Sequence, residues 1–319
     1  MNAMNKIHPM VQRQDEFEIR VPGSIANLGP GFDTLAVAVQ LYLTLRARRL
    51  PGSGDLQFRF IDHEAPGENL IERGYRCLSG ADGSALPSLL VEVRSDIPMQ
   101  AGLGSSAAAI VAGLRLYEAV AGPVSVQTML DAACALEGHP ENAAAALLGG
   151  LAVSCQLPNG SVCASHFLWP EALRFVVLTP NVPLATKQSR ALLPESIAHT
   201  DAVFNLQRVV LLLRSLQSED FSLLRVALAD RLHQPWREKI VPRLAAVLRL
   251  EHRDLLGVCL SGSGPSVVAL AKTNLWEVGE LLASVYRQSN IDYNLRILQA
   301  HQSGWEAYPL CRSGMLCCS

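Results

Sequence analysis

Hydrophobic and polar residues alternate in several short segments of the chain, and longer segments between them carry apolar residues at helical spacing. Alternation with a period of two predicts a half-buried strand, whereas apolar positions three and four apart predict a helix. The predicted strands are Phe17–Val21, Ala36–Arg46, Asp55–Ile61, Leu89–Val93, Leu151–Gln156, Leu173–Thr179, Gly257–Leu260, Ser266–Ala271 and Asn294–Gln299. The predicted helices cover residues 105–120, 125–137, 140–149, 201–217, 220–232, 242–252 and 274–287. Strands and helices mix in both halves, which indicates an α+β fold.

The length and the turn signals predict two domains. A chain of 319 residues is about twice the common domain size. The turn Pro158-Asn159-Gly160 separates the two halves of the pattern. We expect a tail at 1–16, a first domain at 17–157, a second domain at 158–302 and a second tail at 303–319.

Composition excludes several classes of protein. The chain is 49% hydrophobic and 18% charged with a net charge of −2, so it can bury a large core and is not disordered. The longest basic cluster is Arg46-Ala-Arg48-Arg49, which argues against a nucleic-acid partner. The long uncharged runs are broken by glycine and polar residues, which argues against a membrane span. Eight cysteines without zinc or C-x-x-C spacing, and no secretory segment, predict a cytoplasmic protein with reduced thiols.

The segment Ile97–Ile110 carries the clearest chemical signal. Here a turn with Gly102 and Gly104 runs directly into an alanine-rich helix. Glycine accepts a positive φ, and a helix N-terminus offers free N–H groups and a positive dipole end to an anion such as phosphate. The sequence lacks the lysine of the common phosphate-binding loop, so backbone amides would hold most of the charge. A glycine turn before a buried helix is the alternative interpretation.

Two further glycine-rich loops, at residues 22–33 and 261–265, also lie at predicted strand ends. Together the three loops resemble the signature motifs of the GHMP small-molecule kinases, and within that family the homoserine kinases. The strings that carry the resemblance are Pro98–Ala108, Ala26–Asp33, Glu137–Asn142, Thr186-x-x-x-Arg190, His233–Arg237 and Ser261–Ser266. The resemblance covers about residues 17–271, and the predicted topology extends it to about residue 300.

The resemblance implies a fold, a nucleotide and a metal. It implies a ribosomal-protein-like N-terminal domain and a ferredoxin-like C-terminal domain, with the active site between them, and it implies a homodimer. ATP would bind along Pro98, Met99, Gln100, Ala101, Gly102, Leu103, Gly104, Ser105, Ser106, Ala107 and Ala108. Glu137 would bind Mg²⁺ together with the hydroxyl of Ser105 or Ser106.

The resemblance also implies ATP-dependent phosphorylation of the L-homoserine hydroxyl to O-phospho-L-homoserine, in threonine biosynthesis. Asp33 would face the substrate ammonium and Asn27 the hydroxyl. Arg190 and Arg237 would hold the carboxylate, for which the planar guanidinium is well shaped. The remaining implied substrate contacts are His139, Glu141, Asn142, Thr186 and Gly262, and the implied catalytic group is Asn27, Asp33, Glu137 and Arg190. Singly, these residues also fit an Asx turn, a solvated carboxylate or a surface arginine.

Glu141 departs from the family pattern, which usually has Asp at this position. The extra methylene moves the carboxylate by more than about 1 Å, a misplacement that can lower a rate on the order of 100-fold. Two alternatives therefore stay open: a related kinase acting on L-threonine or another small alcohol, and a non-catalytic ATP-binding regulator on the same fold. No residue stands out as a general base, although Asp33 is a candidate.

Overall fold

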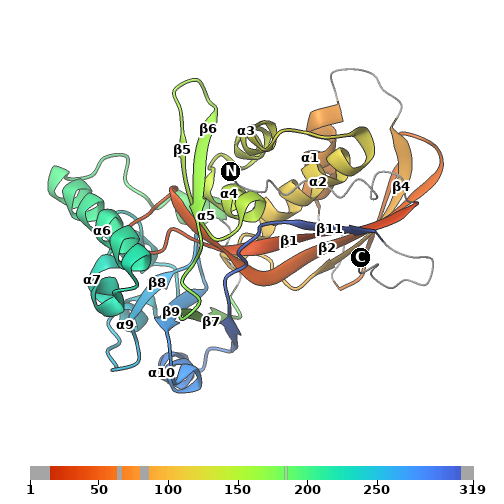
Figure 1. Ribbon diagram of the computed structural model, residues 1–319. Coiled ribbons are helices and arrows are strands. Elements are labelled where there is room, and N and C mark those ends of the chain that lie inside the picture. The colour runs from red at the N-terminus through yellow and green to blue at the C-terminus, as the bar shows by residue number, and fades with distance from the viewer. Residues whose placement is uncertain (1–14, 63–66, 80–85, 183, 185, 310–319) are drawn as a thin grey trace.

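The computed structural model describes residues 15–62, 67–79, 86–182, 184 and 186–309, and it contains two β-sheets (Figure 1). The larger sheet is seven-stranded, with the order β11-β1-β2-β4-β3, while β5 pairs with β2 and β6 with β5. Its strands are β1 (Glu16–Ala26), β2 (Leu35–Ser53), β3 (Leu56–Phe60), β4 (Pro87–Ser95), β5 (Leu151–Gln156), β6 (Val162–Phe167) and β11 (Glu306–Pro309). Among the described strands of this sheet, β3 and β4 pair in parallel and the other pairs are antiparallel.

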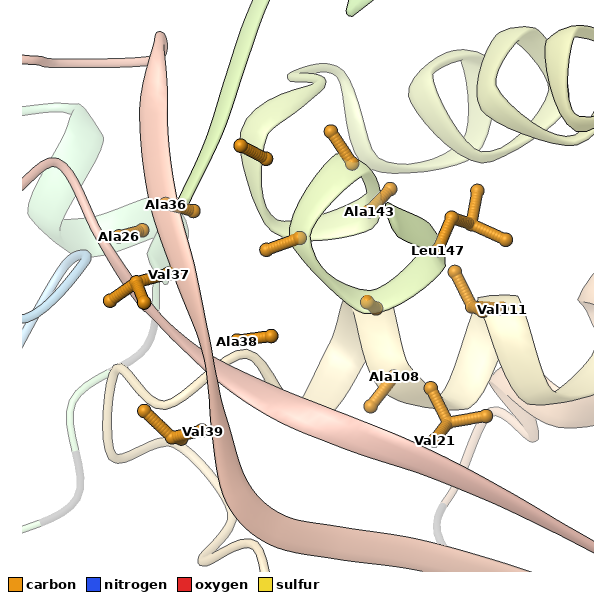
Figure 2. Packing of buried hydrophobic residues seen from close by; sticks show 14 of the residues in the cluster. Val21, Ala26, Ala36, Val37, Ala38, Val39, Ala108, Val111, Ala143 and Leu147 are labelled. Carbon is orange, nitrogen blue, oxygen red and sulfur yellow. The ribbon is translucent and has the colours of Figure 1, made fainter. Parts of the chain in front are cut away.

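Helices α1 to α4 lie together over the larger sheet (Figure 1). They are α1 (Leu70–Ser79), α2 (Ser105–Ala121), α3 (Val126–Glu137) and α4 (Glu141–Leu148). Ala108 on α2 and Ala143 on α4 are at most 1% exposed and belong to the hydrophobic cluster that includes buried residues of β1 and β2, and Ala108 lies close to Val21 of β1 (Figure 2). Their small side chains let the helices approach the sheet closely, and this packing sets the position of the α2 N-terminus.

The smaller sheet has four antiparallel strands in the order β10-β7-β9-β8, which is the ferredoxin-like arrangement. They are β7 (Arg174–Pro180), β8 (Gly257–Leu260), β9 (Val267–Ala271) and β10 (Tyr293–Leu298). The elements between β7 and β8 are α5 (Thr186–Arg190), α6 (His199–Ser218), η2 (Phe221–Leu223), α7 (Leu224–Ala227), α8 (Gln234–Arg237) and α9 (Leu244–Leu248), and α10 (Leu275–Arg287) precedes β10.

Strand β7 joins the two hydrophobic clusters of the molecule. Phe175 and Val177 belong to the cluster that includes the larger sheet, and Val176 and Leu178 belong to the cluster beneath α10. Because both faces of β7 are buried, its sequence is a continuous apolar run rather than an alternating one. The two domains are therefore packed on one another through shared core residues.

The larger sheet reaches beyond the domain limits predicted from sequence. The turn at Pro158–Gly160 closes the β5–β6 hairpin, so the sheet continues past residue 157 to Phe167. Strand β11, inside the predicted tail 303–319, pairs with β1, and Trp305 beside it is 3% exposed. Residues 1–14 and 310–319 of the predicted tails lie outside the described residues.

Several other elements differ from the sequence pattern. Strand β6 and helix α1 were not predicted, and helix 220–232 is reduced to η2 and α7. The predicted helix at 242–252 is shortened to α9. Among the described residues, no helix is both long enough and apolar enough to cross a membrane.

Candidate active site

The three glycine-rich loops meet at a cavity of about 670 Å³. The first domain contributes Asn27, Glu137 and the loop from Met99 to Ala107, and the second contributes Arg190 and Arg237. The cavity therefore lies where the domains join, with the α2 N-terminus on its wall.

The loop before α2 has left-handed backbone at Gln100 (φ 52°), Gly102 (φ 74°) and Gly104 (φ 75°). Glycine is required at 102 because a Cβ there would lie 2.3 Å from the Ser261 carbonyl oxygen. The Ser261 hydroxyl donates to the Gly102 carbonyl at 2.6 Å, and the Ser24 N–H donates to the Leu103 carbonyl at 3.0 Å. The loop is thus braced by both domains.

No side chain of the described residues caps the N-terminus of α2. Gly104 occupies the N-cap position and has no side chain to accept from the first-turn amides. A helix end of this kind keeps N–H donors and a positive partial charge available. Ser105 and Ser106 line the cavity at the same place, so the arrangement suits a phosphate.

Acidic and basic groups gather beside this helix end, at the turn between α3 and α4. The Ser106 hydroxyl donates to the Glu137 carboxylate. His139 lies between two carboxylates, with its Nδ1 3.1 Å from Glu141 Oε1 and its Nε2 3.7 Å from Glu137 Oε2. Burial lowers the pKa of His139, but hydrogen bonding to Glu141 and the charges of Glu141 and Glu137 outweigh it, and the net shift is upward.

Glu141 is almost completely buried, at 2% exposure. Its Oε1 accepts from the Asn142 amide at 2.8 Å, while its Oε2 has no hydrogen-bond partner among the described residues. Asn142 Oδ1 accepts in turn from the Ser24 hydroxyl at 2.6 Å. This chain of contacts links Glu141 to the β1 strand and fixes one side of the cavity.

The first loop turns at Asn27, whose backbone is left-handed (φ 72°) and whose side chain is 3% exposed. The Asn27 amide donates to the Gly262 carbonyl at 3.1 Å and accepts from the Asp33 N–H at 3.1 Å. Asn27 thereby ties the loop to the β8–β9 turn. It also lines the cavity, so its position has both a scaffold role and access to a ligand.

Arg190 forms a two-point ion pair with Asp33 across the domain boundary. Its Nη1 lies 2.9 Å from Asp33 Oδ2, and its Nη2 lies 2.5 Å from Asp33 Oδ1. Burial lowers the pKa of Arg190, but the hydrogen bonds to Asp33 and its negative charge outweigh burial, so the net shift of the pKa is upward. The pair presents a cation and an anion side by side at the cavity.

Arg237 is 2% exposed and also lines the cavity. Its Nη1 donates to the Gly262 carbonyl at 2.8 Å and to His233 Nδ1 at 2.9 Å, while its buried Nε has no partner among the described residues. Burial first, and then the charge of Arg190, lower the pKa of Arg237 to about 10, so it remains cationic at neutral pH. Both guanidinium groups flank the Phe32 ring, at 5.4 and 5.5 Å.

The structure brings nearly all the residues singled out from sequence to this one cavity. Pro98 and Ala108 do not line it, and Ala108 is fully buried in the core. Thr186 begins α5, but its side chain lies outside the described part of the structure.

Sequence reasoning missed the far end of the cavity. That end is lined by Leu43, Phe60, Asp62, Glu68, Asn69, Leu70, Ile71, Arg73, Val93 and Ser95. These residues come from β2, β3 and β4, from positions 62, 68 and 69 between β3 and α1, and from the start of α1, and no local motif marks them. Phe32 and Lys187 were also missed, although both lie inside strings that the sequence analysis had singled out.

Comparison with known proteins agrees with the geometry. Residues 69–150 match the GHMP kinases N terminal domain, and residues 212–275 match the GHMP kinases C terminal domain. A homoserine kinase of Solibacter usitatus is 36% identical over 280 residues, covering 85% of this chain and 90% of the relative. One of Synechococcus sp. is 35% identical over 294 residues, covering 90% and 96%.

Solved structures show the same likeness. The crystal structure of homoserine kinase from Cytophaga hutchinsonii matches with a TM-score of 0.80 at 25% identity, covering 92% of this chain and 98% of that one. The galactokinase of Lactococcus lactis, at 12% identity and a TM-score of 0.68, shares the fold. The chain therefore belongs to the GHMP kinase family and, within it, to the family of the homoserine kinases.

Proposed function

We propose that this protein phosphorylates the side-chain hydroxyl of L-homoserine with ATP, forming O-phospho-L-homoserine for threonine biosynthesis. One observation carries the proposal: an uncapped helix N-terminus and two arginines line the same cavity. The first suits a polyphosphate and the second suits the carboxylate of an amino acid. The names of the related proteins supply the acceptor.

In this proposal ATP lies along the cavity with its phosphates over the loop from Met99 to Ala107. The adenine would lie at the far end, where Leu43, Phe60 and Val93 offer an apolar wall. Backbone amides and the α2 dipole bind the phosphates, because the loop itself contains no lysine. Such preorganised donors stabilise charge that develops during phosphoryl transfer.

Glu137 and Ser106 are the residues that would hold Mg²⁺. They already contact one another at the α2 N-terminus, and both present oxygen ligands, which Mg²⁺ prefers. Mg²⁺ commonly binds through one or two carboxylates together with phosphate oxygens and water. When bound, the ion would neutralise phosphate charge. Ser106, rather than Ser105, makes the contact with Glu137.

An amino-acid zwitterion complements the Asp33–Arg190 pair. Its carboxylate would bind Arg190 and Arg237, and its ammonium would bind Asp33, so each charge meets its opposite. The chain between these groups then directs the hydroxyl toward Asn27 and the phosphates. Orientation of this kind accounts for much of the rate in phosphoryl transfer, which asks little covalent chemistry of the protein.

The test is ADP release with ATP and Mg²⁺ and a panel of homoserine, threonine, serine, shikimate and mevalonate. Turnover with homoserine alone supports the proposal. Turnover with threonine instead would assign the acceptor differently, and Glu141 would then be the first residue to exchange for Asp. Thermal stabilisation by ATP without turnover of any acceptor would identify a regulator.

For assembly and location, we propose a homodimer in the cytoplasm. Leu206 and Val210 lie one turn apart on α6 and are each 67% exposed, which a second copy would cover. Sedimentation of the wild type and of Leu206→Asp tests this: the wild type should sediment as a dimer and the variant as a monomer.

A further inference from the structure

His233 is a fully buried histidine whose two ring nitrogens contact two different parts of the site. Its Nε2 lies 2.8 Å from the Gly29 carbonyl oxygen, on the loop that carries Asn27 and Asp33. Its Nδ1 lies 2.9 Å from Nη1 of Arg237, four residues along the chain. The Phe32 ring stacks on the imidazole with centroids 5.3 Å apart. His233 thus lies between the first glycine loop and the second arginine.

These contacts allow only one form of the imidazole. A guanidinium group only donates hydrogen bonds, so Nδ1 must be unprotonated and accept from Arg237. A carbonyl only accepts, so Nε2 must carry the proton and donate to Gly29. The neutral Nε2–H tautomer satisfies both neighbours at once. The doubly protonated ring would direct an N–H at the guanidinium and lose the contact.

Asp230 fixes the backbone that carries His233. Its carboxylate is fully buried and accepts from the N–H groups of Leu232, His233 and Gln234 at 2.9, 3.0 and 2.7 Å. It also accepts from the Asn205 amide at 2.7 Å, and the same amide donates to the Pro30 carbonyl at 3.1 Å.

The first loop is therefore held from the second domain at two successive residues, Gly29 and Pro30. Glycine is needed at the first of them, since a Cβ on Gly29 would lie 2.1 Å from the Leu228 carbonyl oxygen. This close approach leaves the loop little freedom to shift relative to His233.

We propose that His233, as its neutral Nε2–H tautomer, is a positioning residue that aims Arg237 at the acceptor carboxylate and holds the Asn27–Asp33 loop in register with it. The inference rests on the proposed function only in that Arg237 binds the acceptor. It explains why a buried histidine precedes Arg237 by one helical turn. The carboxylate end and the hydroxyl end of the acceptor site are then fixed by a single side chain.

A double-mutant cycle between His233→Ala and Arg237→Ala tests this. Homoserine binding would be measured by calorimetry with a non-hydrolysable ATP analogue present, so the result does not depend on turnover. We expect His233→Ala to weaken homoserine binding on the order of 10- to 100-fold, with ATP-analogue binding changed less than about threefold. In the Arg237→Ala background the same change should weaken binding clearly less than it does in the wild type, because only the contact with the Gly29 loop is then lost.

The matched control is His301→Ala, because His301 is also buried but lies outside the cavity. It should leave both affinities unchanged. His233→Gln provides a second variant, in which an amide replaces the ring; it should bind homoserine more tightly than His233→Ala.

Equal losses in both Arg237 backgrounds, or equal losses of homoserine and ATP-analogue binding, would overturn the inference. Failure of both His233 variants to fold, seen by circular dichroism, would also overturn it, because His233 would then be a folding determinant. Wild-type protein that binds homoserine without phosphorylating it would remove the proposed function and leave the cycle interpretable.

Discussion

The Arg190–Asp33 pair allows a sharp prediction because stability and substrate binding should respond very differently to its loss. Arg190 is 36% exposed and Asp33 29% exposed, and they form a two-point contact at the cavity. Arg190→Ala removes this pair and, in our proposal, one of the two guanidinium groups that bind the acceptor carboxylate.

The two effects differ in magnitude. An ion pair this exposed to solvent contributes about 0–1 kcal/mol, so the free energy of unfolding should fall by less than about 1 kcal/mol. Hydrogen bonds to a charged group contribute about 1.5–3 kcal/mol, which corresponds to roughly a 10- to 150-fold increase in the KM for homoserine. The KM for ATP should change little, because Arg190 faces the acceptor end.

The assay is steady-state ADP release with each substrate varied in turn, together with thermal unfolding. Arg231→Ala is the matched control, since Arg231 forms a 3.1 Å ion pair with Asp201 outside the cavity. It should cost similar stability and leave both KM values unchanged. Equal increases of the two KM values in Arg190→Ala, or a homoserine KM within about threefold of wild type, would refute the assignment.

Three further predictions concern the metal, the loop and pH. Glu137→Gln should lower kcat on the order of 100-fold at fixed Mg²⁺, with partial recovery as the Mg²⁺ concentration is raised, because an amide replaces the charged ligand. A titration of kcat against Mg²⁺ concentration checks this, and a wild-type dependence on Mg²⁺ would remove Glu137 from the metal site. Gly104→Ala should cost about 1–2 kcal/mol, seen as a lower Tm, because φ is 75°, and its Cβ would lie 2.1 Å from Ser24 Oγ. The ATP KM should also rise by at least about tenfold, and a wild-type ATP KM would contradict the phosphate assignment. Burial, the largest cause, lowers the pKa of His233 to about 4, so between pH 6.5 and 4 only the unfolded state takes up that proton. The contribution of His233 to the free energy of unfolding is therefore lost as pH falls, by up to about 1.4 kcal/mol per pH unit. Urea unfolding at pH 7 and pH 5 should show this loss, and the difference between the two pH values should be smaller in His233→Gln. An equal difference in the wild type and in His233→Gln would count against the prediction.

Much of the fold follows from local pattern. Alternation and helical spacing place most strands and helices, since they depend on which face of each segment is buried. Strand β6 and helix α1 were not predicted although both carry a local signal: burial alternates along β6, and the buried residues Ile71, Gly74 and Tyr75 of α1 lie at helical spacing. Strand β11 was not predicted because its partner β1 lies almost 300 residues away in the chain, and such pairing has no local signature.

The candidate site also has features that local sequence predicts and features that depend on distant segments. The glycines at 102 and 104 and the helix after them predicted an anion site, because left-handed turns and helix ends are local features. The choice of Ser106 over Ser105 beside Glu137, the pairing of Arg190 with Asp33 and the burial of Glu141 are not local. Each depends on side chains brought together from separate elements.

The sequence by itself determined the kinase family, and it predicted the phosphate-binding loop and the residues that would contact an amino-acid substrate. Only the tertiary structure decided that His233 joins Arg237 to the first glycine loop, and that the apolar end of the cavity is built from β2, β3 and β4. The physical reason is the separation along the chain of the residues that interact. Turn conformation and hydrophobic periodicity depend on near neighbours in the sequence, whereas a cavity wall or a buried hydrogen-bond network forms only after distant segments have packed.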